Sequence, residues 1–374
     1  MYGGESTPEA EPQTIISVEN EIITHDNNCT LEDINKVNEY LECSKIKFEN
    51  RLRQQQIKES SIDDFIIHKT IGMGAFGRVL LVNYKLKPEK FLAMKIMKKE
   101  QILKRNFLQH VFNEKQLSSN LRHPFIIHME YYAKDICNLY FIMPFIVGGD
   151  LFGLMSERGV LDELHAMFYA GQMILALEYL HSLDIIYRDL KPENVLIAAD
   201  GFIKLTDLGL SKRITSNRTT TLCGTPYYLA PEIIAIKPYG KPVDWWALGI
   251  IIFEMVSGSV PFIADTEKKL FYKILSGSYR MPINFSPNLS HFVKNLLQVD
   301  LSKRYGNLQN GISDIKSHRW FNKIDWIILY NKNMVPQYIP TFNSPSDTHN
   351  FESFVEEDTS IICNGVDQTH FANF

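Results

Sequence analysis

From Phe65 onward, the chain is rich in β-forming residues first and in helix-forming residues later. Five strand-like runs are separated by glycines and charged turns, at residues 65–71, 79–84, 91–95, 126–132 and 139–145. Helical patterns occur at residues 107–121, 161–181, 243–257 and 291–299, and all but the first follow Gly148-Gly149. This order predicts an α+β fold in which a small β-rich lobe, residues 65–147, precedes a helical lobe, residues 148–320.

The two ends of the chain differ from this central region. Residues 1–30 are polar and acidic, and we expect them to be disordered. Residues 31–64 are predicted to form an amphipathic helix and a linker, because apolar side chains recur at roughly helical spacing between Leu31 and Leu52. The helix would lie on a partner surface, and a solvated charged helix is the alternative, because Ser44 and Lys45 interrupt the apolar stripe.

The last segment, residues 321–374, is an extended tail that contains several prolines and an acidic run. Disorder is one reading of such a composition. Its aromatic residues favour instead a strap packed on the core: Phe342, Phe351, Phe354, Phe371 and Phe374.

The overall composition excludes several classes of protein. A net charge of −4 argues against binding to nucleic acid. The five cysteines show no C-x-x-C spacing, so we expect neither a zinc site nor a disulfide framework, and a reducing compartment. Residues 1–12 contain no secretory signal, and the longest apolar stretch, around residues 247–253, is too short for a transmembrane segment. The expected location is the cytoplasm, with the nucleus as a second compartment.

Residues 72–79 match the pattern G-x-G-x-x-G-x-V. Glycines allow backbone N–H groups to approach phosphate oxygens without a clash from Cβ. A dinucleotide-binding turn has the same spacing but opens directly into a helix, whereas Val79 here continues as a strand. A glycine loop between two strands is typical of protein kinases. The residues predicted to bind nucleotide here are Gly72, Gly74, Ala75, Phe76, Gly77 and Val79.

A lysine and a glutamate complete the predicted phosphate-binding part of this region. The sequence A-M-K-I at residues 93–96 matches the V-A-I-K strand of protein kinases, with Ala93 and Lys95 as nucleotide-binding residues. A lone lysine on a strand is usually just solvated. Lys95 gains a catalytic role only if it pairs with Glu114, which lies in the predicted helix 107–121.

Residues 187–194, Y-R-D-L-K-P-E-N, match the catalytic-loop pattern H-R-D-L-x-x-x-N, with tyrosine in place of histidine. Asp189 would accept a hydrogen bond from the substrate hydroxyl, and Lys191 would neutralise charge on the transferred phosphoryl group. Asn194 and, thirteen residues later, Asp207 would bind the metal ion. Phosphoryl transfer needs charge neutralisation more than covalent chemistry, and this set of side chains supplies it.

Three further segments resemble those of the AGC group of protein kinases. They are T-L-C-G-T-P-Y-Y-L-A-P-E at 221–232, V-D-W-W-A-L-G at 243–249 and L-L-Q-V-D-L-S-K-R-Y-G-N-L at 296–308. Together with F-x-x-F at the end of the chain, they resemble the catalytic subunits of cyclic-AMP-dependent protein kinase, from about Phe48 to Phe374. The resemblance implies a bilobal protein kinase domain over residues 65–320 and an AGC-type tail over residues 321–374. It also implies ATP and Mg²⁺ as cofactors and phosphorylation of serine or threonine in proteins.

The resemblance assigns roles to further residues. Thr221 matches the activating phosphothreonine, and the basic groups that bind its phosphate match His110, Arg188 and Lys212. The gatekeeper, the adenine-binding hinge and a tail aromatic at the nucleotide match Met143, Phe145, Ile146 and Phe351. Asp244 and Arg304 match structural residues that hold the catalytic loop and the A-P-E segment.

The substrate site implied by the resemblance is acidic beside the phosphorylated residue and apolar after it. Asp150 matches a carboxylate shared by the ribose and a substrate arginine. Glu193, which also lies at the nucleotide, and Glu254 match the carboxylates that bind the arginine two residues before the phosphorylated one. The pocket for the following apolar residue matches Leu222, Pro226 and Leu229. The expected substrate sequence is therefore Arg-Arg-x-Ser/Thr followed by an apolar residue.

Departures from the family pattern concern partners more than chemistry. Thr220 and Phe271 replace a tryptophan and a tyrosine at the docking surface for the inhibitory cyclic-AMP-binding regulatory subunit. Tyr227 replaces a glutamate that serves a more distant substrate arginine. The activation loop has one extra residue within 214–218, and the tail has no serine at position 362, although Thr359 and Ser360 are close.

Two other functions are compatible with parts of this pattern. A pseudokinase scaffold usually lacks the lysine or one of the two aspartates, and Lys95, Asp189 and Asp207 are all present here. An AGC kinase that no cyclic-AMP-binding subunit controls would usually extend past F-x-x-F with a phosphorylatable residue, whereas this sequence stops at Phe374.

Overall fold

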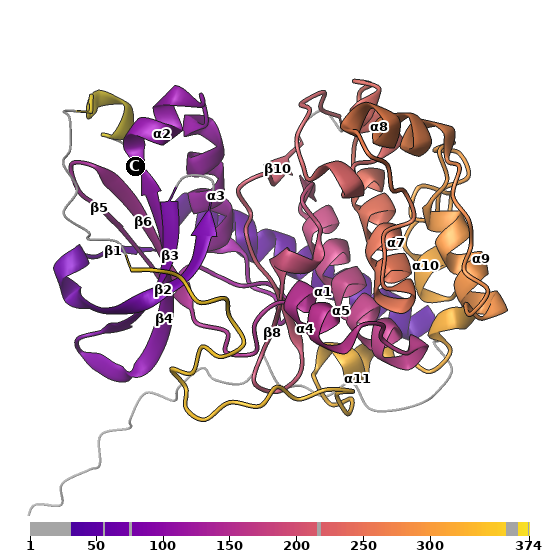
Figure 1. Cartoon of the computed structure of the whole chain (residues 1–374), viewed down its shortest axis with the longest axis horizontal. Coiled ribbons are helices and arrows are strands. Elements are labelled where there is room, and N and C mark those ends of the chain that lie inside the picture. The colour runs from indigo at the N-terminus through magenta and orange to yellow at the C-terminus, as the bar shows by residue number, and fades with distance from the viewer. Residues whose placement is uncertain (1–30, 55–56, 75–76, 215–217, 357–365, 373) are drawn as a thin grey trace, which may run out of the picture.

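The structure, a computed structural model, describes residues 31–374 except 55–56, 75–76, 215–217, 357–365 and 373. Residues 1–30, for which we expect disorder, and the loop and tail positions 215–217, 359, 360 and 362 lie outside the described residues. The described chain forms a β-rich small lobe followed by a helical large lobe, as the sequence predicts (Figure 1). No described helix is both long enough and apolar enough to cross a membrane.

The small lobe is a six-stranded sheet with two helices. Its strands are β1 (Lys58–Glu59), β2 (Phe65–Gly74), β3 (Gly77–Tyr84), β4 (Lys87–Lys98), β5 (Tyr131–Lys134) and β6 (Asn138–Pro144). They lie in the order β1-β5-β6-β4-β3-β2. The helices α2 (Lys99–Lys104) and α3 (Leu108–Asn120) follow β4. Because β2 lies at the edge of the sheet, its outward backbone groups need partners from elsewhere.

The strand predicted over residues 126–132 is mostly wrong, because β5 begins only at Tyr131. The apolar residues before it are buried where the two lobes meet. Ile127 N donates to Leu205 O at 2.9 Å, and Met129 N donates to Ser118 O at 2.8 Å. The run of β-branched residues therefore reflects burial between the lobes rather than pairing within the sheet.

The large lobe is built on two helices that are buried at almost every position, α5 (Glu163–Ser182) and α7 (Pro242–Ser257). Both are apolar on all sides, which a helix can be only inside a large core. The other helices are α4 (Leu151–Arg158), α6 (Pro231–Ile234), α8 (Glu267–Ser276), α9 (Pro287–Leu296), α10 (Ser313–Lys316) and α11 (Trp326–Tyr330). Short strands carry the site loops: β7 (Ile185–Ile186), β8 (Val195–Ile197), β9 (Ile203–Leu205) and β10 (Lys212–Arg213).

Helix α9 begins at Pro287, earlier than the predicted start at residue 291. The hydroxyl of Ser286 accepts a hydrogen bond from Leu289 N at 3.1 Å, and Pro287 occupies the first turn. Ser followed by Pro is a strong helix start, and the apolar pattern alone does not register it.

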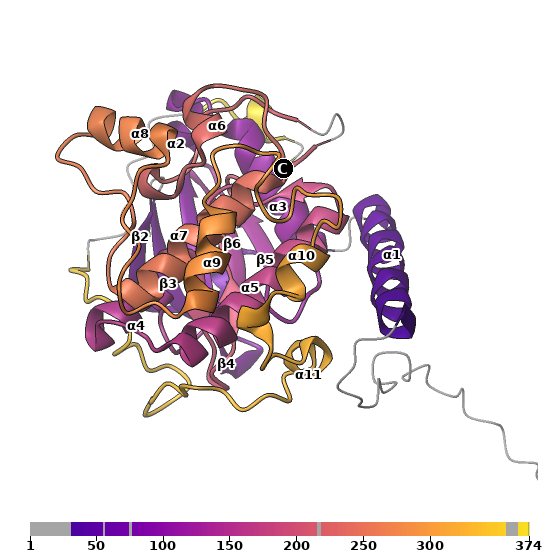
Figure 2. The ribbon, with the colours of Figure 1, turned by 90° about the vertical axis from the view of Figure 1, so that its right-hand side faces the viewer.

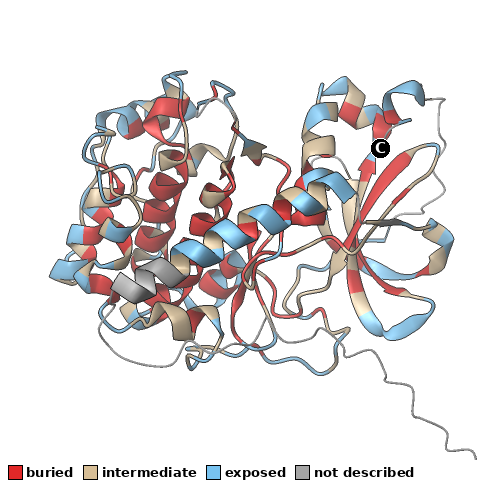
Figure 3. Ribbon diagram, turned by 180° about the vertical axis from the view of Figure 1, so that it is seen from behind, coloured by how far each residue is buried: buried red, intermediate tan, exposed pale blue. Residues whose placement is uncertain are grey.

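Helix α1 (Leu31–Gln54) lies along the outside of the core, on the face opposite to the view of Figure 1 (Figures 2 and 3). Phe48 is fully buried, and Ser44, which interrupts the apolar stripe in the sequence, is buried too. Lys45 Nζ lies 3.3 Å from Asp184 Oδ2, and Glu49 pairs with Arg213 of β10. The helix thus packs on the core, and a fully solvated helix is the wrong alternative.

The tail returns from the large lobe to the small lobe, where the chain ends (Figure 1). The Phe351 ring lies 5.3 Å from the Phe145 ring, measured between centroids. Phe371 and Phe374 are buried against the small lobe, and the Phe374 ring stacks on Phe141 at 5.8 Å. Phe342, in contrast, is exposed.

The cysteine spacing predicts no disulfide framework, but Cys137 is disulfide-bonded. Cys43 and Cys223 are free thiols. Sequence spacing shows cysteine pairs only when both members belong to a short motif, and Cys137 has no such neighbour.

Candidate active site

Lys95, Glu114 and Asp207 meet where the two lobes join. Lys95 comes from β4, Glu114 from α3, and Asp207 from the turn after β9. Lys95 Nζ lies 2.7 Å from Glu114 Oε1 and 3.0 Å from Asp207 Oδ1. The expected lysine–glutamate pair is therefore present, and the lysine also reaches the aspartate predicted to bind metal.

The charges of this triad depend on burial and on one another. Burial opposes the charge on Lys95, but the carboxylates of Asp207 and Glu114 outweigh it and raise the pKa of the lysine. Burial raises the pKa of Glu114 to about 7, against the effect of Lys95. For Asp207, whose side chain is partly exposed, the charge of Lys95 and a hydrogen bond from Gly209 N lower the pKa. The triad holds Lys95 charged and Asp207 ionised at neutral pH.

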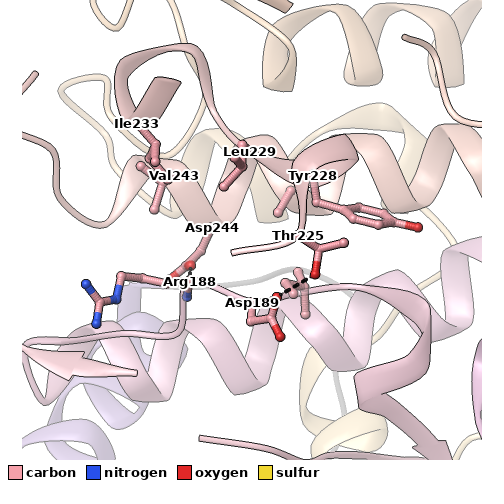
Figure 4. A pocket seen from close by; sticks show the side chains of 10 residues that line it. Arg188, Asp189, Thr225, Tyr228, Leu229, Ile233, Val243 and Asp244 are labelled. Atoms are coloured by element: carbon pink, nitrogen blue, oxygen red, sulfur yellow. Dashed lines mark hydrogen bonds between the residues drawn. The ribbon is translucent and has the colours of Figure 1, made fainter. Parts of the chain in front are cut away.

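The catalytic-loop residues converge on the carboxylate of Asp189. Lys191 Nζ lies 3.0 Å from Asp189 Oδ2, and Asn194 Nδ2 donates to the same oxygen at 3.0 Å. The Thr225 hydroxyl donates to Asp189 Oδ1 at 2.9 Å and accepts from Lys191 Nζ at 3.0 Å. Figure 4 shows Thr225 and Asp189 pointing toward each other. A hydroxyl presented to Asp189 would thus meet an oriented acceptor with a lysine beside it.

The buried carboxylate of Asp244, on α7, holds the backbone of the catalytic loop. Its Oδ1 accepts from Arg188 N at 2.8 Å, and its Oδ2 accepts from Tyr187 N at 3.0 Å. Arg188 has a positive φ of 70°, which is costly for a residue with a side chain. The backbone hydrogen bonds to Asp244 and the bond from Arg188 Nε to Leu210 O at 2.6 Å stabilise this conformation.

The A-P-E segment is anchored by a buried ion pair. Arg304 is fully buried and binds Glu232 with both terminal nitrogens, at 2.6 and 2.9 Å. Its Nε donates to Gln298 O at 2.9 Å, and its guanidinium lies over the Trp246 ring at 5.1 Å. This bidentate geometry uses the planar fork of arginine, which lysine lacks.

The three basic residues predicted to bind the phosphate of Thr221 come together. Burial and the neighbouring charges of Arg188 and Lys212 lower the pKa of His110. Lys212 Nζ donates to Thr219 Oγ1 at 3.1 Å, and the Thr219 hydroxyl lies 3.4 Å from the exposed Thr221 hydroxyl. An anionic group on Thr221 would therefore meet the positive charges of Arg188 and Lys212.

The acidic residues predicted for substrate binding also lie close enough to influence one another. Burial raises the pKa of Asp150, and the charges of Glu193 and Glu352 raise it further. Burial raises the pKa of Glu254 as well, Glu193 adds to this effect, and a hydrogen bond from the Tyr228 hydroxyl at 2.7 Å opposes it. A cation placed among these carboxylates would relieve their repulsion.

The predicted adenine-binding residues line the link between the lobes. Ala93 on β4 pairs with Met143 on β6, and the Thr206 hydroxyl points to Met143 Sδ at 4.0 Å. The residues that follow β6 are Phe145, which meets the tail residue Phe351, and Ile146.

The glycine loop connects β2 to β3, as expected from its strand context. Gly72 pairs with Val79, and Gly74 pairs with Gly77. A Cβ on Gly77 would lie 2.3 Å from Ile96 O, so only glycine fits there. The predicted nucleotide-binding residues Ala75 and Phe76 lie outside the described residues.

The three residues predicted for the apolar substrate pocket have different surroundings. Leu229 is buried beside a small cavity that Tyr228, Ile233 and Val243 also line. Leu222 is 56% exposed, and Pro226 begins a short 3₁₀ turn, Pro226–Tyr228. These three residues therefore do not form a closed pocket in the part of the chain that the structure describes.

Sequence reasoning missed two hydroxyl groups that position site residues, Thr225 and Tyr228. Both lie inside the segment 221–232 that carries the family resemblance, but the motif assigns them no role. Their bonds to Asp189, Lys191 and Glu254 depend on how this segment folds back over the catalytic loop.

Asp207 and Asn194 have the chemistry to hold a hard divalent cation. The Asp207 side chain is 44% exposed, so its carboxylate is open to a ligand. Asn194 uses Nδ2 to bind Asp189 O at 2.8 Å and Asp189 Oδ2, which leaves the carbonyl oxygen as a metal ligand. Carboxylate and amide oxygens are the ligands that Mg²⁺ prefers.

Comparison with known proteins identifies the family. The protein kinase domain matches residues 65–321 of this chain. The chain belongs to the protein kinase family. It is 44% identical over 298 residues to the human cAMP-dependent protein kinase catalytic subunit PRKX, covering 80% of this chain and 83% of that protein. Identity to the Drosophila melanogaster cAMP-dependent protein kinase catalytic subunit 2 is 43% over 315 residues, 83% of this chain and 88% of the relative.

A third relative, the Drosophila melanogaster catalytic subunit 3, is 43% identical over 302 residues, and this chain spans only 52% of its length. These matches confirm the predicted fold and the AGC-type resemblance. The kinase is a serine/threonine protein kinase that uses ATP and a divalent metal ion.

Proposed function

We propose that this kinase phosphorylates serine or threonine in Arg-Arg-x-Ser/Thr sequences that are followed by an apolar residue. This proposal rests on the position of Glu193, which lies close enough to both Asp150 and Glu254 for its charge to add to burial in raising the pKa of each. Arginine suits such a group of carboxylates, because its guanidinium can bind a carboxylate with two parallel hydrogen bonds. Tyr227 supplies no carboxylate, so we expect selectivity to be concentrated near the phosphorylated residue.

We assign Asp189 as the acceptor for the substrate hydroxyl and Lys191 as the cation beside the transferred phosphoryl group. Lys95, held by Glu114, would bind the α- and β-phosphates of ATP. Mg²⁺ would be held by Asn194 and Asp207, and it would supply charge neutralisation at the phosphates. The oxygen ligands and the open carboxylate of Asp207 support Mg²⁺ as the metal.

In this proposal residues 65–320 are the catalytic domain, residues 31–64 are a docked helix with its linker, and residues 321–374 are a tail that completes the small lobe. The buried Phe48 supports the role of the helix, and the buried Phe371 and Phe374 support the role of the tail.

We also propose control by an inhibitory cyclic-AMP-binding regulatory subunit, as the names of the relatives suggest. The docking surface would include α8, where Tyr272 is 75% exposed. A second candidate is a kinase that no such subunit controls. Thr220 and Phe271 favour this alternative, because they replace larger or more polar aromatic residues of the family pattern.

A positional peptide-library screen on the purified kinase tests the substrate proposal. Arginine should be selected at the two positions described and an apolar residue after the phosphorylated one. Glu254→Gln should lower kcat/KM for the double-arginine peptide about thirtyfold, which corresponds to a loss of about 2 kcal/mol in transition-state stabilisation. Glu42→Gln, on the exposed side of α1, is the matched control and should behave like wild type. Selection of acidic or proline-directed sequences would contradict the proposal.

Titration with a regulatory subunit separates the two modes of control. Inhibition that cyclic AMP relieves supports the first mode. Full activity at every concentration of the subunit supports the second, and Thr220→Trp with Phe271→Tyr should then restore inhibition.

A further inference from the structure

The strand that leads into the glycine loop has an irregular edge at Thr70. β2 pairs with β3, but the register shifts between Ile67 and Lys69 and again between Thr70 and Gly72. Thr70 is only 4% exposed, and it lies two residues before the first glycine of the loop. A buried backbone N–H on an edge strand needs a hydrogen-bond acceptor from outside the sheet.

The acceptor is a carboxylate from the tail, Glu356. Its Oε1 accepts from Thr70 N at 2.6 Å, and its Oε2 accepts from the Thr70 hydroxyl at 2.8 Å. Both carboxylate oxygens are thus used on one residue that is 286 positions away in the sequence. These bonds, with the charges of Arg78 and Lys69, lower the pKa of Glu356, so the carboxylate is ionised at neutral pH.

The two ends of the glycine loop are held in different ways. At the exit, Gly77 lies against the backbone of β4, with Ile96 O only 2.3 Å from an ideal Cβ position. At the entrance, β2 has β3 on one side only. The pair Glu356–Thr70 therefore supplies the second anchor that the entrance otherwise lacks.

The same tail segment also contacts the link between the lobes. Asn350 Nδ2 donates to Val147 O at 3.1 Å, and Phe351 packs on Phe145. Residues 350–356 thus run from the predicted adenine-binding link to the strand that carries the glycine loop. The tail contacts both parts of the protein that would enclose ATP.

We propose that Glu356 is a positioning residue for ATP binding, because its carboxylate fixes the entrance strand of the glycine loop through Thr70. The inference rests on the proposed kinase function and on the prediction that the glycine loop between β2 and β3 binds the phosphates of ATP. Glu356 does not touch the nucleotide in this proposal and acts only through Thr70.

The test compares Glu356→Ala with Glu356→Gln in the full-length kinase. Alanine removes both acceptors, and KM for ATP should rise about five- to tenfold while KM for the peptide is unchanged. Glutamine can accept from Thr70 N and donate to the Thr70 hydroxyl, so it should restore most of the ATP affinity. Glu89→Ala, an exposed glutamate of the β3–β4 hairpin, is the control for loss of surface charge.

Thr70→Val provides a second measurement, because it keeps the backbone bond and removes only the hydroxyl. It should weaken ATP binding less than Glu356→Ala does, and the double variant should be no worse than Glu356→Ala alone. Direct titration with ATP, followed by nucleotide-dependent thermal stabilisation, gives the affinity independently of turnover.

An unchanged KM for ATP in Glu356→Ala would overturn the inference. So would a glutamine variant as impaired as alanine, or a fall in melting temperature without nucleotide that accounts for the whole loss. A wild-type kinase that binds ATP but ignores double-arginine peptides would contradict the proposed function and leave the ATP titration as the test of Glu356.

Discussion

Replacing Thr225 by valine tests how far the catalytic carboxylate depends on its neighbours. Valine has nearly the shape of threonine but lacks the hydroxyl that bridges Asp189 Oδ1 and Lys191 Nζ, at 2.9 and 3.0 Å. A hydrogen bond to a charged group contributes about 1.5–3 kcal/mol. Asp189 keeps its contacts with Lys191 and Asn194, each at 3.0 Å, so the loss should lie near the lower end.

A loss of about 1.5–2 kcal/mol in the transition state corresponds to a fall in kcat of about ten- to thirtyfold. Steady-state kinetics with saturating ATP and a double-arginine peptide measure it directly. Thr225→Ser keeps the hydroxyl and should retain most of the activity, while KM for ATP should change little in either variant. If valine left kcat within about twofold of wild type, or if serine were as impaired as valine, the bridge would have no catalytic role.

Three other properties follow from the geometry of the site. Thr221→Ala should lower activity, because the basic cluster then lacks its anion; mass spectrometry of active enzyme should find phosphate on Thr221, and unchanged activity would contradict this ordering. Burial raises the pKa of Glu114 to about 7, so kcat/KM should fall as the pH drops below 7, because protonation of Glu114 weakens its pair with Lys95. The variant Glu114→Gln should be less active, and its activity should not show this fall at low pH. Arg304→Met should cost about 3–5 kcal/mol in chemical denaturation, because it leaves Glu232 buried without its partner, whereas loss of an exposed pair should cost less than about 1 kcal/mol.

The chemistry of the site could be predicted because its residues lie in short motifs whose spacing the reaction constrains. Lys95, Asp189 and Asp207 are recognisable from a few neighbours each, and the partner Glu114 follows from helical context. The order of strands and helices likewise predicted both lobes.

The contacts of the tail could not be predicted in the same way. The acidic run at residues 356–358 supplies carboxylates that can accept hydrogen bonds, but nothing in the local sequence indicates which strand they reach. The bond between Glu356 and Thr70 depends on the whole path of the chain between them. The missed role of Thr225 has a similar origin, since its partners come from another loop.

Helix α1 is fastened to the core in two physically different ways. Phe48 is buried, whereas the pairs Lys45–Asp184 and Glu49–Arg213 involve side chains that are each about one-third exposed. Salt screens the exposed charges, with a Debye length of about 8 Å at physiological ionic strength, but leaves the aromatic anchor intact. Rising ionic strength would therefore weaken the two ion pairs and leave α1 held by Phe48 and by contacts such as the Tyr40–Tyr330 ring pair, while Arg213, next to Lys212 in the activation segment, loses its counterion.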